Sequence, residues 1–307
     1  MTTAFITGVS GFVGGHLSKF LFSRSWRVSG QDLRPAPNIQ NFYQSDLHDR
    51  RALQEAMAET RPDVIFHLAG VIKSDTPDRY YQAHVLGTVA LLDTVVASGL
   101  SPVVFIASSS AVYGFGLGRR PITEQFKPRP ATHYGVSKLA QELAALHYFT
   151  SFDLPVILVR TFNLLGPGLS SQLACSAFAK QIAKAERDGV NSTITTGDLS
   201  ARRDFVDVRD AVRAYVLLAE KGQAGQAYNV ASGQAVAIWE CLDFLRRQAR
   251  LPIKAILDPA RLQKIDIPVQ VGSAKRLRDQ TGWEPEISIE QSLLDLLDDW
   301  RQRVKTE

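Results

Sequence analysis

The chain has 307 residues, of which 45% are hydrophobic and 21% are charged. This is the composition of a globular protein, long enough for one large or two modest domains. The net charge of +4 comes from 35 basic and 31 acidic residues that are dispersed along the chain. Because no basic stripe with interleaved aromatic residues is present, we expect no nucleic-acid partner.

Cysteine content and the N-terminal residues indicate the compartment. Cys175 and Cys241 are too few for a disulfide framework, and no spacing of cysteine and histidine predicts a metal site. The first three residues run into an apolar strand without a basic leader, and no apolar stretch long enough to span a bilayer follows. We therefore expect a cytoplasmic protein without a membrane partner.

Strands and helices alternate through the first half of the chain. Short apolar runs predict strands at 4–7, 26–32, 64–68, 103–107 and 156–160. Helical periodicity predicts helices at 12–22, 51–59, 87–98 and 134–149. Repeated strand–helix–strand units with continuously apolar strands are typical of a parallel sheet buried on both faces. The predicted fold is α/β, a doubly wound parallel sheet of the Rossmann type.

The alternation loosens after residue 168, where helices are expected near 174–187, 211–220, 239–250 and 290–301. We interpret residues 1–165 as an NAD(P)-binding domain to which 205–228 returns. Residues 166–204 and 229–307 then form a smaller, mixed α/β substrate lobe that is interleaved with the first domain.

A ladder of glycines marks the first strand–helix junction. Gly8 permits a tight turn, Gly11 lets the backbone approach a pyrophosphate, and Gly14 allows the helix to pack closely on the sheet. Phe12 and Val13 stand between Gly11 and Gly14, at the start of the predicted helix. Glycines also mark ordinary turns, but their position at the first junction predicts a dinucleotide site.

Acidic residues after the next two strands are candidates for the adenosine half of the cofactor. Asp32 closes the second strand, where a carboxylate binds ribose hydroxyls and repels a 2′-phosphate. This favours NAD, although Arg34 can partly compensate, so NADP is possible. Asp46 and Leu47 follow a third candidate strand and either reach the adenine or form a solvated loop.

Small residues end the strand at 64–68. Leu68, Ala69 and Gly70 either let the cofactor approach the backbone or form a plain tight turn.

Tyr134 and Lys138 are four residues apart, which places them on one face of a helix. A neighbouring ammonium stabilises a phenolate, so we expect Lys138 to lower the pKa of Tyr134. Both residues also belong to the expected cofactor site. Beside them, Ser108, Ser109 and Ser110 follow a strand at the carboxyl edge of the sheet, where a hydroxyl can bind the reacting oxygen. The residues alone leave open which serine points inward.

These motifs together resemble the extended short-chain dehydrogenase/reductases that act on nucleotide sugars, also described as the NAD-dependent epimerase/dehydratase family. The resemblance covers nearly the whole chain. It implies Tyr134 and Lys138 as catalytic residues and, from a serine three residues before the run Val112–Gly114, selects Ser109 as the catalytic hydroxyl. We expect Ser110 to contact the substrate.

The resemblance also implies a diphosphate site. Asn163 in Arg160–Asn163 and Arg203 in Arg203–Val208 look like the residues that bind the sugar-nucleotide diphosphate in the family. Gln263 and Asp266 are in the segment expected to hold the nucleotide.

Longer stretches, such as 178–182 and 271–277, are similar to the branch of GDP-4-keto-6-deoxy-mannose reductases that form GDP-rhamnose. Three positions depart from that branch. Ala111 replaces an acid that a dehydratase requires, Gln263 replaces an arginine that helps to hold the nucleotide, and His84 replaces an asparagine.

The function expected from this resemblance is a reductase of a nucleoside-diphosphate 4-keto-6-deoxy sugar. Hydride goes to C4, Tyr134 acts as the acid, Ser109 orients the oxygen, and Lys138 binds the nicotinamide ribose. The alternative is an NAD-dependent 4-epimerase of a nucleotide sugar, and a remote alternative is a non-catalytic dinucleotide sensor. Family resemblance also implies a homodimer formed by the helices at 87–98 and 134–149.

Overall fold

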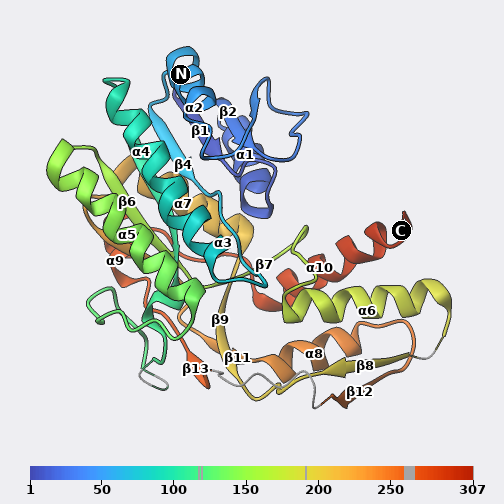
Figure 1. The fold of residues 1–307 in the computed structure, drawn as a ribbon. Helices are drawn as coiled ribbons and strands as arrows, with labels where there is room; N and C mark the ends of the chain where they lie inside the picture. Colours follow the sequence, from blue (N-terminus) through green and yellow to red (C-terminus); the bar gives the residue numbers. More distant parts are fainter. Residues whose placement is uncertain (117, 119, 191, 259–266, 307) are drawn as a thin grey trace.

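A seven-stranded parallel sheet lies at the centre of the computed structural model, which describes residues 1–116, 118, 120–190, 192–258 and 267–306 (Figure 1). Its strands are β1 (Thr3–Thr7), β2 (Arg27–Asp32), β3 (Asn41–Gln44), β4 (Val64–His67), β5 (Val103–Ser109), β6 (Val156–Thr161) and β10 (Ala227–Val230). They are arranged in the order β10-β6-β5-β4-β1-β2-β3, and every neighbouring pair is parallel. Every residue of β4 and β6 is buried, as continuously apolar strands predict.

Helices cover both faces of this sheet, which confirms the doubly wound fold. On one face lie α1 (Phe12–Ser23), α7 (Val208–Lys221) and α9 (Lys275–Thr281). On the other lie α2 (Arg50–Thr60), α4 (Gly87–Ala97) and α5 (His133–Phe152). The strand order reverses between β1 and β4, and ligands of such sheets bind in the crevice at this reversal, outside the carboxyl ends of the strands.

A smaller α/β lobe lies below the carboxyl edge in the view of Figure 1. In its four-stranded sheet, β9 (Arg202–Asp207) pairs with β7 (Asn163–Leu165), β11 (Ala235–Ala237) and β13 (Val269–Gln270). The two remaining strands, β8 (Ser192–Thr196) and β12 (Ile253–Leu257), pair with each other. The helices α6 (Ala174–Asp188), α8 (Ile238–Arg247) and α10 (Ile289–Arg303) share a separate apolar core.

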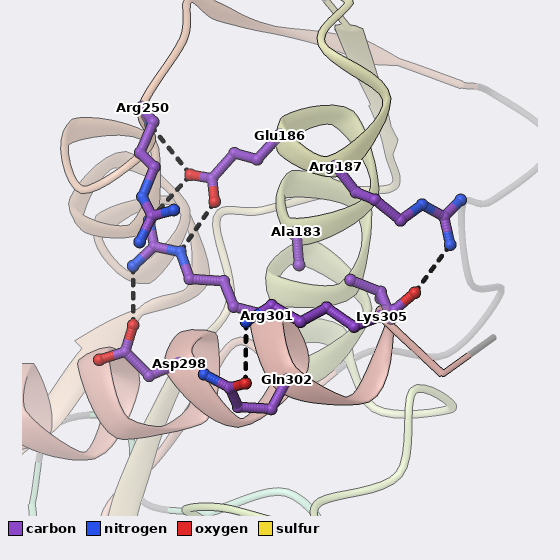
Figure 2. Close-up of a pocket in the computed structure, with 9 residues that line it drawn as sticks. Ala183, Glu186, Arg187, Arg250, Asp298, Arg301, Gln302 and Lys305 are labelled. Atoms are coloured by element: carbon purple, nitrogen blue, oxygen red, sulfur yellow. Dashed lines mark hydrogen bonds and ion pairs between the residues drawn. The ribbon is translucent and has the colours of Figure 1, made fainter.

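Ion pairs between α6 and α10 line a cavity of 170 Å³ in this lobe (Figure 2). Arg301 donates to both carboxylate oxygens of Glu186, each at 2.8 Å, and also contacts Asp298. The backbone nitrogen of Arg250, just beyond α8, donates to the same Glu186. Because the charges of Glu186, Asp298 and Arg301 are engaged with one another across α6 and α10, we interpret the cluster as structural.

Two short elements between β4 and α4 were not predicted from the sequence. These are α3 (Asp78–Tyr81) and a turn of π-helix, η1 (Gln82–Leu86), which runs directly into α4. The two elements have only four and five residues, too few for a helical pattern to be recognised reliably in the sequence. The wide turn of η1 places His84 in the protein interior, where it becomes part of the site described next.

Candidate active site

The glycine turn between β1 and α1 has the shape of a phosphate cradle. Gly8 has a φ of +75°, and a Cβ at this position would lie 2.8 Å from the backbone nitrogen of Ala69. Gly11 is the N-cap residue of α1, so the N-terminus of this helix directly follows the turn. Between them, the Oγ of Ser10 is a buried side-chain atom without a hydrogen-bond partner among the described residues. An orphaned hydroxyl in a backbone cradle fits an anionic ligand such as a dinucleotide pyrophosphate.

Ser10 was not singled out from the sequence, although its place between Gly8 and Gly11 was a usable signal. Phe12 and Val13 open α1 and pack, partly buried, against the core. Gly14 sits over the turn so closely that a Cβ there would lie 2.8 Å from the Cα of Val9.

At the end of β2, the Asp32 carboxylate accepts hydrogen bonds from two backbone nitrogens. Its Oδ2 accepts from the Ser10 nitrogen at 3.1 Å, and its Oδ1 accepts from the Arg34 nitrogen at 3.2 Å. The carboxylate thus stands beside the glycine turn, where a charged group influences the choice between NAD and NADP. Arg34 is exposed, two residues further along.

The other candidate cofactor residues lie after β3 and β4. Asp46 accepts from the backbone nitrogen and the Nδ1 of His48, which fits the loop interpretation left open by the sequence. Leu47 is nearly buried, with 9% of its surface exposed. The backbone nitrogens of Leu68 and Ala69 donate to Thr7 at the end of β1, so these residues lie at the carboxyl ends of β1 and β4, next to Gly70.

Tyr134 lies in the first turn of α5, which begins because the Oγ1 of Thr132 accepts from the backbone nitrogen of Gly135. Burial raises the pKa of Tyr134 above its usual value, and a hydrogen bond with the Ser109 side chain offsets part of this shift. The lowered pKa that the Tyr/Lys spacing predicts is therefore wrong for this arrangement. A phenol with a raised pKa is protonated at neutral pH, as a general acid must be.

The ammonium of Lys138 is directed to the end of β5. Its Nζ donates to the carbonyl of Ala107 at 2.8 Å and to the Oε1 of Gln141 at 3.0 Å. Burial lowers the pKa of this amine to about 7, and the nearby Glu142 opposes the shift. Lys138 therefore changes charge near neutral pH.

His84 fastens the turn after β4 to the helix that carries Tyr134. Its Nε2 accepts from the backbone nitrogen of Val71 at 3.1 Å, so its proton is on Nδ1, which donates to the Oγ of Ser137 at 2.8 Å. The Ser137 hydroxyl in turn donates to the carbonyl of Tyr134. The ring of His84 also meets that of Tyr134 edge to face, with centroids 5.6 Å apart.

A buried ion pair is hydrogen-bonded to the first residue of the serine segment, Ser108–Ser110. Arg160 on β6 donates to both carboxylate oxygens of Glu142 on α5, at 2.8 and 2.7 Å. The Ser108 hydroxyl donates to the same carboxylate at 2.5 Å. Sequence analysis did not identify Glu142, because an acid on a helix shows its partner only once the helix is packed.

The structure separates the roles of the neighbouring serines. The Ser109 side chain is hydrogen-bonded to Tyr134, whereas the Ser110 hydroxyl donates to the Oε1 of Gln270 on β13 at 3.0 Å. Ser110 thus ties the serine segment to the second lobe, and its expected contact with substrate stays a prediction.

The expected diphosphate residues lie on the small sheet next to this edge. Asn163 on β7 pairs in register with Phe205 on β9, and its Nδ2 donates to the carbonyl of Asp204 at 3.0 Å. The guanidinium of Arg203 donates to the carbonyls of Arg202 and Ile267, so it faces the segment that follows residue 266. Gln263 and Asp266 lie outside the described residues. Among those residues, no cluster of histidine, cysteine, aspartate or glutamate is arranged to hold a metal ion.

Comparisons with known proteins agree with this geometry. The model of the NAD dependent epimerase/dehydratase family matches residues 4–231. GDP-6-deoxy-D-mannose reductase from Pseudomonas aeruginosa is 37% identical over 99% of this chain and 98% of its own length. The structure of RMD from the same organism complexed with NADPH superposes with a TM-score of 0.89, at 35% identity, over 99% of this chain and 100% of that chain. Thermus thermophilus UDP-glucose 4-epimerase complexed with NAD gives a TM-score of 0.87 at 25% identity, over 98% and 99%.

The fold and the comparisons define a nicotinamide-dinucleotide enzyme of the epimerase and oxidoreductase class. The chain belongs to the NAD dependent epimerase/dehydratase family, within the extended short-chain dehydrogenase/reductases. Its cofactor is a nicotinamide dinucleotide, NAD or NADP. No helix among the described residues is long and apolar enough to cross a membrane.

Proposed function

We propose that this enzyme reduces a nucleoside-diphosphate 4-keto-6-deoxy sugar of the GDP-4-keto-6-deoxy-mannose type. The observation that carries this proposal is the 37% identity, over 99% of the chain, with a GDP-6-deoxy-D-mannose reductase. The protonated, buried Tyr134 supports it, because a reductase needs an acid at the reacting oxygen.

In the proposed mechanism, the glycine turn from Gly8 to Gly14 would hold the nicotinamide dinucleotide, which would supply the hydride for C4 of the sugar. Tyr134 donates its phenolic proton to the C4 oxygen, and Ser109 orients that oxygen through its hydroxyl. The charge of Lys138 stabilises the phenolate that remains. Asn163 and Arg203 bind the diphosphate, for which charge-assisted and neutral hydrogen bonds combine.

A 4-epimerase is the second candidate, supported by the similarity to the Thermus enzyme and by Asp32 beside the glycine turn. Such an enzyme takes a hydride from the sugar and returns it to the other face, without net change in the cofactor. Ala111 is compatible with both reactions and speaks against a dehydratase.

One assay separates the two functions. The protein is given GDP-4-keto-6-deoxy-mannose with NADH or NADPH, and in parallel UDP-glucose with NAD. A reductase oxidises one reduced nicotinamide for each sugar converted, so absorbance falls in step with product. Interconversion of UDP-glucose and its 4-epimer without an absorbance change assigns the protein as an epimerase.

We further propose that the protein is a homodimer formed through α4 and α5. The exposed apolar side chains Val136, Leu143 and Phe152 on α5 support this assembly. Sedimentation of the wild type and of Leu143→Glu tests it, since the variant should be monomeric.

A further inference from the structure

Behind Lys138, a row of buried polar side chains crosses from α5 to β1. Gln141 on α5, Thr88 on α4, His67 on β4 and Thr7 on β1 all have 0% of their surface exposed. They are joined by hydrogen bonds of 2.7 to 2.8 Å. Buried polar groups of this kind are costly unless each is satisfied, so their donor and acceptor assignments can be worked out from the geometry.

The hydroxyl of Thr88 determines the direction of the row. It has one hydrogen, which it donates to the backbone carbonyl of His84 at 2.5 Å. Its oxygen must therefore accept from both other neighbours, the Nε2 of Gln141 and the Nε2 of His67, each at 2.8 Å.

Two assignments follow from this direction. The side-chain amide of Gln141 has its nitrogen on Thr88, so its oxygen must face the Nζ of Lys138, 3.0 Å away. His67 carries its proton on Nε2, so its Nδ1 accepts from the Thr7 hydroxyl at 2.7 Å. Burial, with a smaller effect from the charge of Lys138, lowers the pKa of His67 to about 3. The ring thus stays neutral at working pH, and the direction of the row does not reverse.

We propose that Gln141 is a positioning residue for the reaction: locked by Thr88, its amide oxygen holds the ammonium of Lys138 at the carboxyl edge of the sheet. This inference rests on the proposed role of Lys138 in the mechanism. Because Thr7 directly precedes Gly8, the row also connects this ammonium to the glycine turn. The carbonyl of Ala107 is the second protein group on the Nζ, so removing the Gln141 oxygen leaves one of these two acceptors.

The charge of Lys138 responds to four titratable groups around it. Glu142 on the same helix favours the ammonium, whereas His67 on β4 and His84 on η1 oppose it only when they are charged. Burial lowers the pKa of both histidines far enough to keep them neutral. Tyr134, the fourth group, is uncharged until it gives up its proton. An acceptor at position 141 therefore raises the pKa of Lys138, in the same direction as the Glu142 carboxylate.

The test compares Gln141→Met with Gln141→Glu in the full-length protein, assayed with the sugar nucleotide and reduced cofactor from pH 5.5 to 9.5. Methionine keeps the length of the side chain but has no strong acceptor. We expect kcat to fall roughly tenfold or more, with KM for the sugar nucleotide nearly unchanged, and the alkaline limb of the kcat profile to move to lower pH. Glutamate adds a charged acceptor, so it should move the same limb to higher pH.

Opposite pH shifts of the alkaline limb in Gln141→Met and Gln141→Glu would indicate a positioning role. A merely structural defect would not shift this limb in opposite directions in the two variants. Gln291→Met, on α10 and outside the site, is the matched control and should match the wild type. If Gln141→Met fails to fold, Thr88→Val is the second variant. It frees the amide of Gln141 to rotate, so the alkaline limb of the kcat profile should move to lower pH, by less than is expected for Gln141→Met.

The inference would be overturned if the Gln141 variants fold and the alkaline limb of their kcat profiles stays at the wild-type pH. Lys138→Met separates this failure from that of the proposed function. A large loss in Lys138→Met with unchanged Gln141 variants rejects only the role of Gln141, whereas near-normal turnover in Lys138→Met rejects the mechanism itself.

Discussion

The backbone nitrogen of Ser10 donates to the Oδ2 of Asp32 across 3.1 Å, and this contact joins the glycine turn to the end of β2. Asp32 therefore acts in two separable ways. Its oxygens hold the turn and the following backbone at Arg34, while its charge stands where the adenosine ribose of the cofactor is expected.

The charge of Asp32 should make NADH bind more tightly than NADPH. Asp32→Asn keeps an acceptor oxygen for the turn but removes the charge, so the difference in affinity should narrow. Isothermal titration with both dinucleotides measures it, with Asp46→Asn as the control that leaves the difference unchanged. A tighter Kd for NADPH in the wild type would show that Arg34, not Asp32, governs the pocket.

Replacing Tyr134 by phenylalanine keeps the ring packing and removes the proton. Turnover should drop by roughly 10²- to 10⁴-fold, with dinucleotide affinity nearly unchanged. Tyr80→Phe is the matched control, since that ring lies beside Tyr134 with centroids 5.9 Å apart, while its hydroxyl accepts from the backbone of Ser74. Wild-type turnover in Tyr134→Phe would remove this phenol from the mechanism.

Arg203→Ala should raise KM for the sugar nucleotide and leave dinucleotide affinity unaltered, because a diphosphate in a partly dry cleft needs a charged partner. Initial rates over a range of sugar-nucleotide concentrations give KM directly. The neighbouring Arg202 contacts the carbonyl of Ala235 and the carboxylate of Glu240 instead, so Arg202→Ala should keep the wild-type KM. If Arg203→Ala and Arg202→Ala have equal KM values, Arg203 does not bind the diphosphate.

Breaking the ion pair between Glu142 and Arg160 should destabilise the fold strongly. The two side chains are 2% and 8% exposed, so Glu142→Gln leaves a buried guanidinium without its charged partner, at a cost of about 3–5 kcal/mol. Glu55→Gln removes one partner of the exposed pair with Arg51 and should cost less than about 1 kcal/mol. Urea unfolding of both variants measures the contrast, and similar losses in the two would contradict it.

The low pKa of Lys138 predicts a pH dependence of stability. Folding lowers the pKa of the amine from 10.5 to about 7, so between these values the unfolded chain binds a proton that the folded protein releases. Stability relative to Lys138→Met, which cannot titrate, should therefore rise from pH 7 to pH 9, by on the order of 2 kcal/mol. Below pH 7 the difference should level off. A constant difference from pH 6 to 9 would mean that the amine is not desolvated.

Features that depend on residues close together in the chain could be predicted from the sequence. Continuous apolar strands alternating with helices predicted the parallel sheet, and Gly8, Gly11 and Gly14 predicted the cofactor turn. The spacing of Tyr134 and Lys138 predicted a shared helix face. Each of these signals is contained in a short segment, where backbone geometry and periodicity act directly.

The tertiary structure determines which groups surround those motifs. It reversed the expected pKa shift of Tyr134, because burial raises this pKa and the hydrogen bond with the Ser109 side chain offsets only part of the rise. It also brought Thr7 to His67 across 60 positions of sequence and His84 to Ser137 across 53. Hydrogen bonds between such distant side chains leave no periodic trace in the sequence, since only the packing of β1, β4, α4 and α5 makes those residues neighbours.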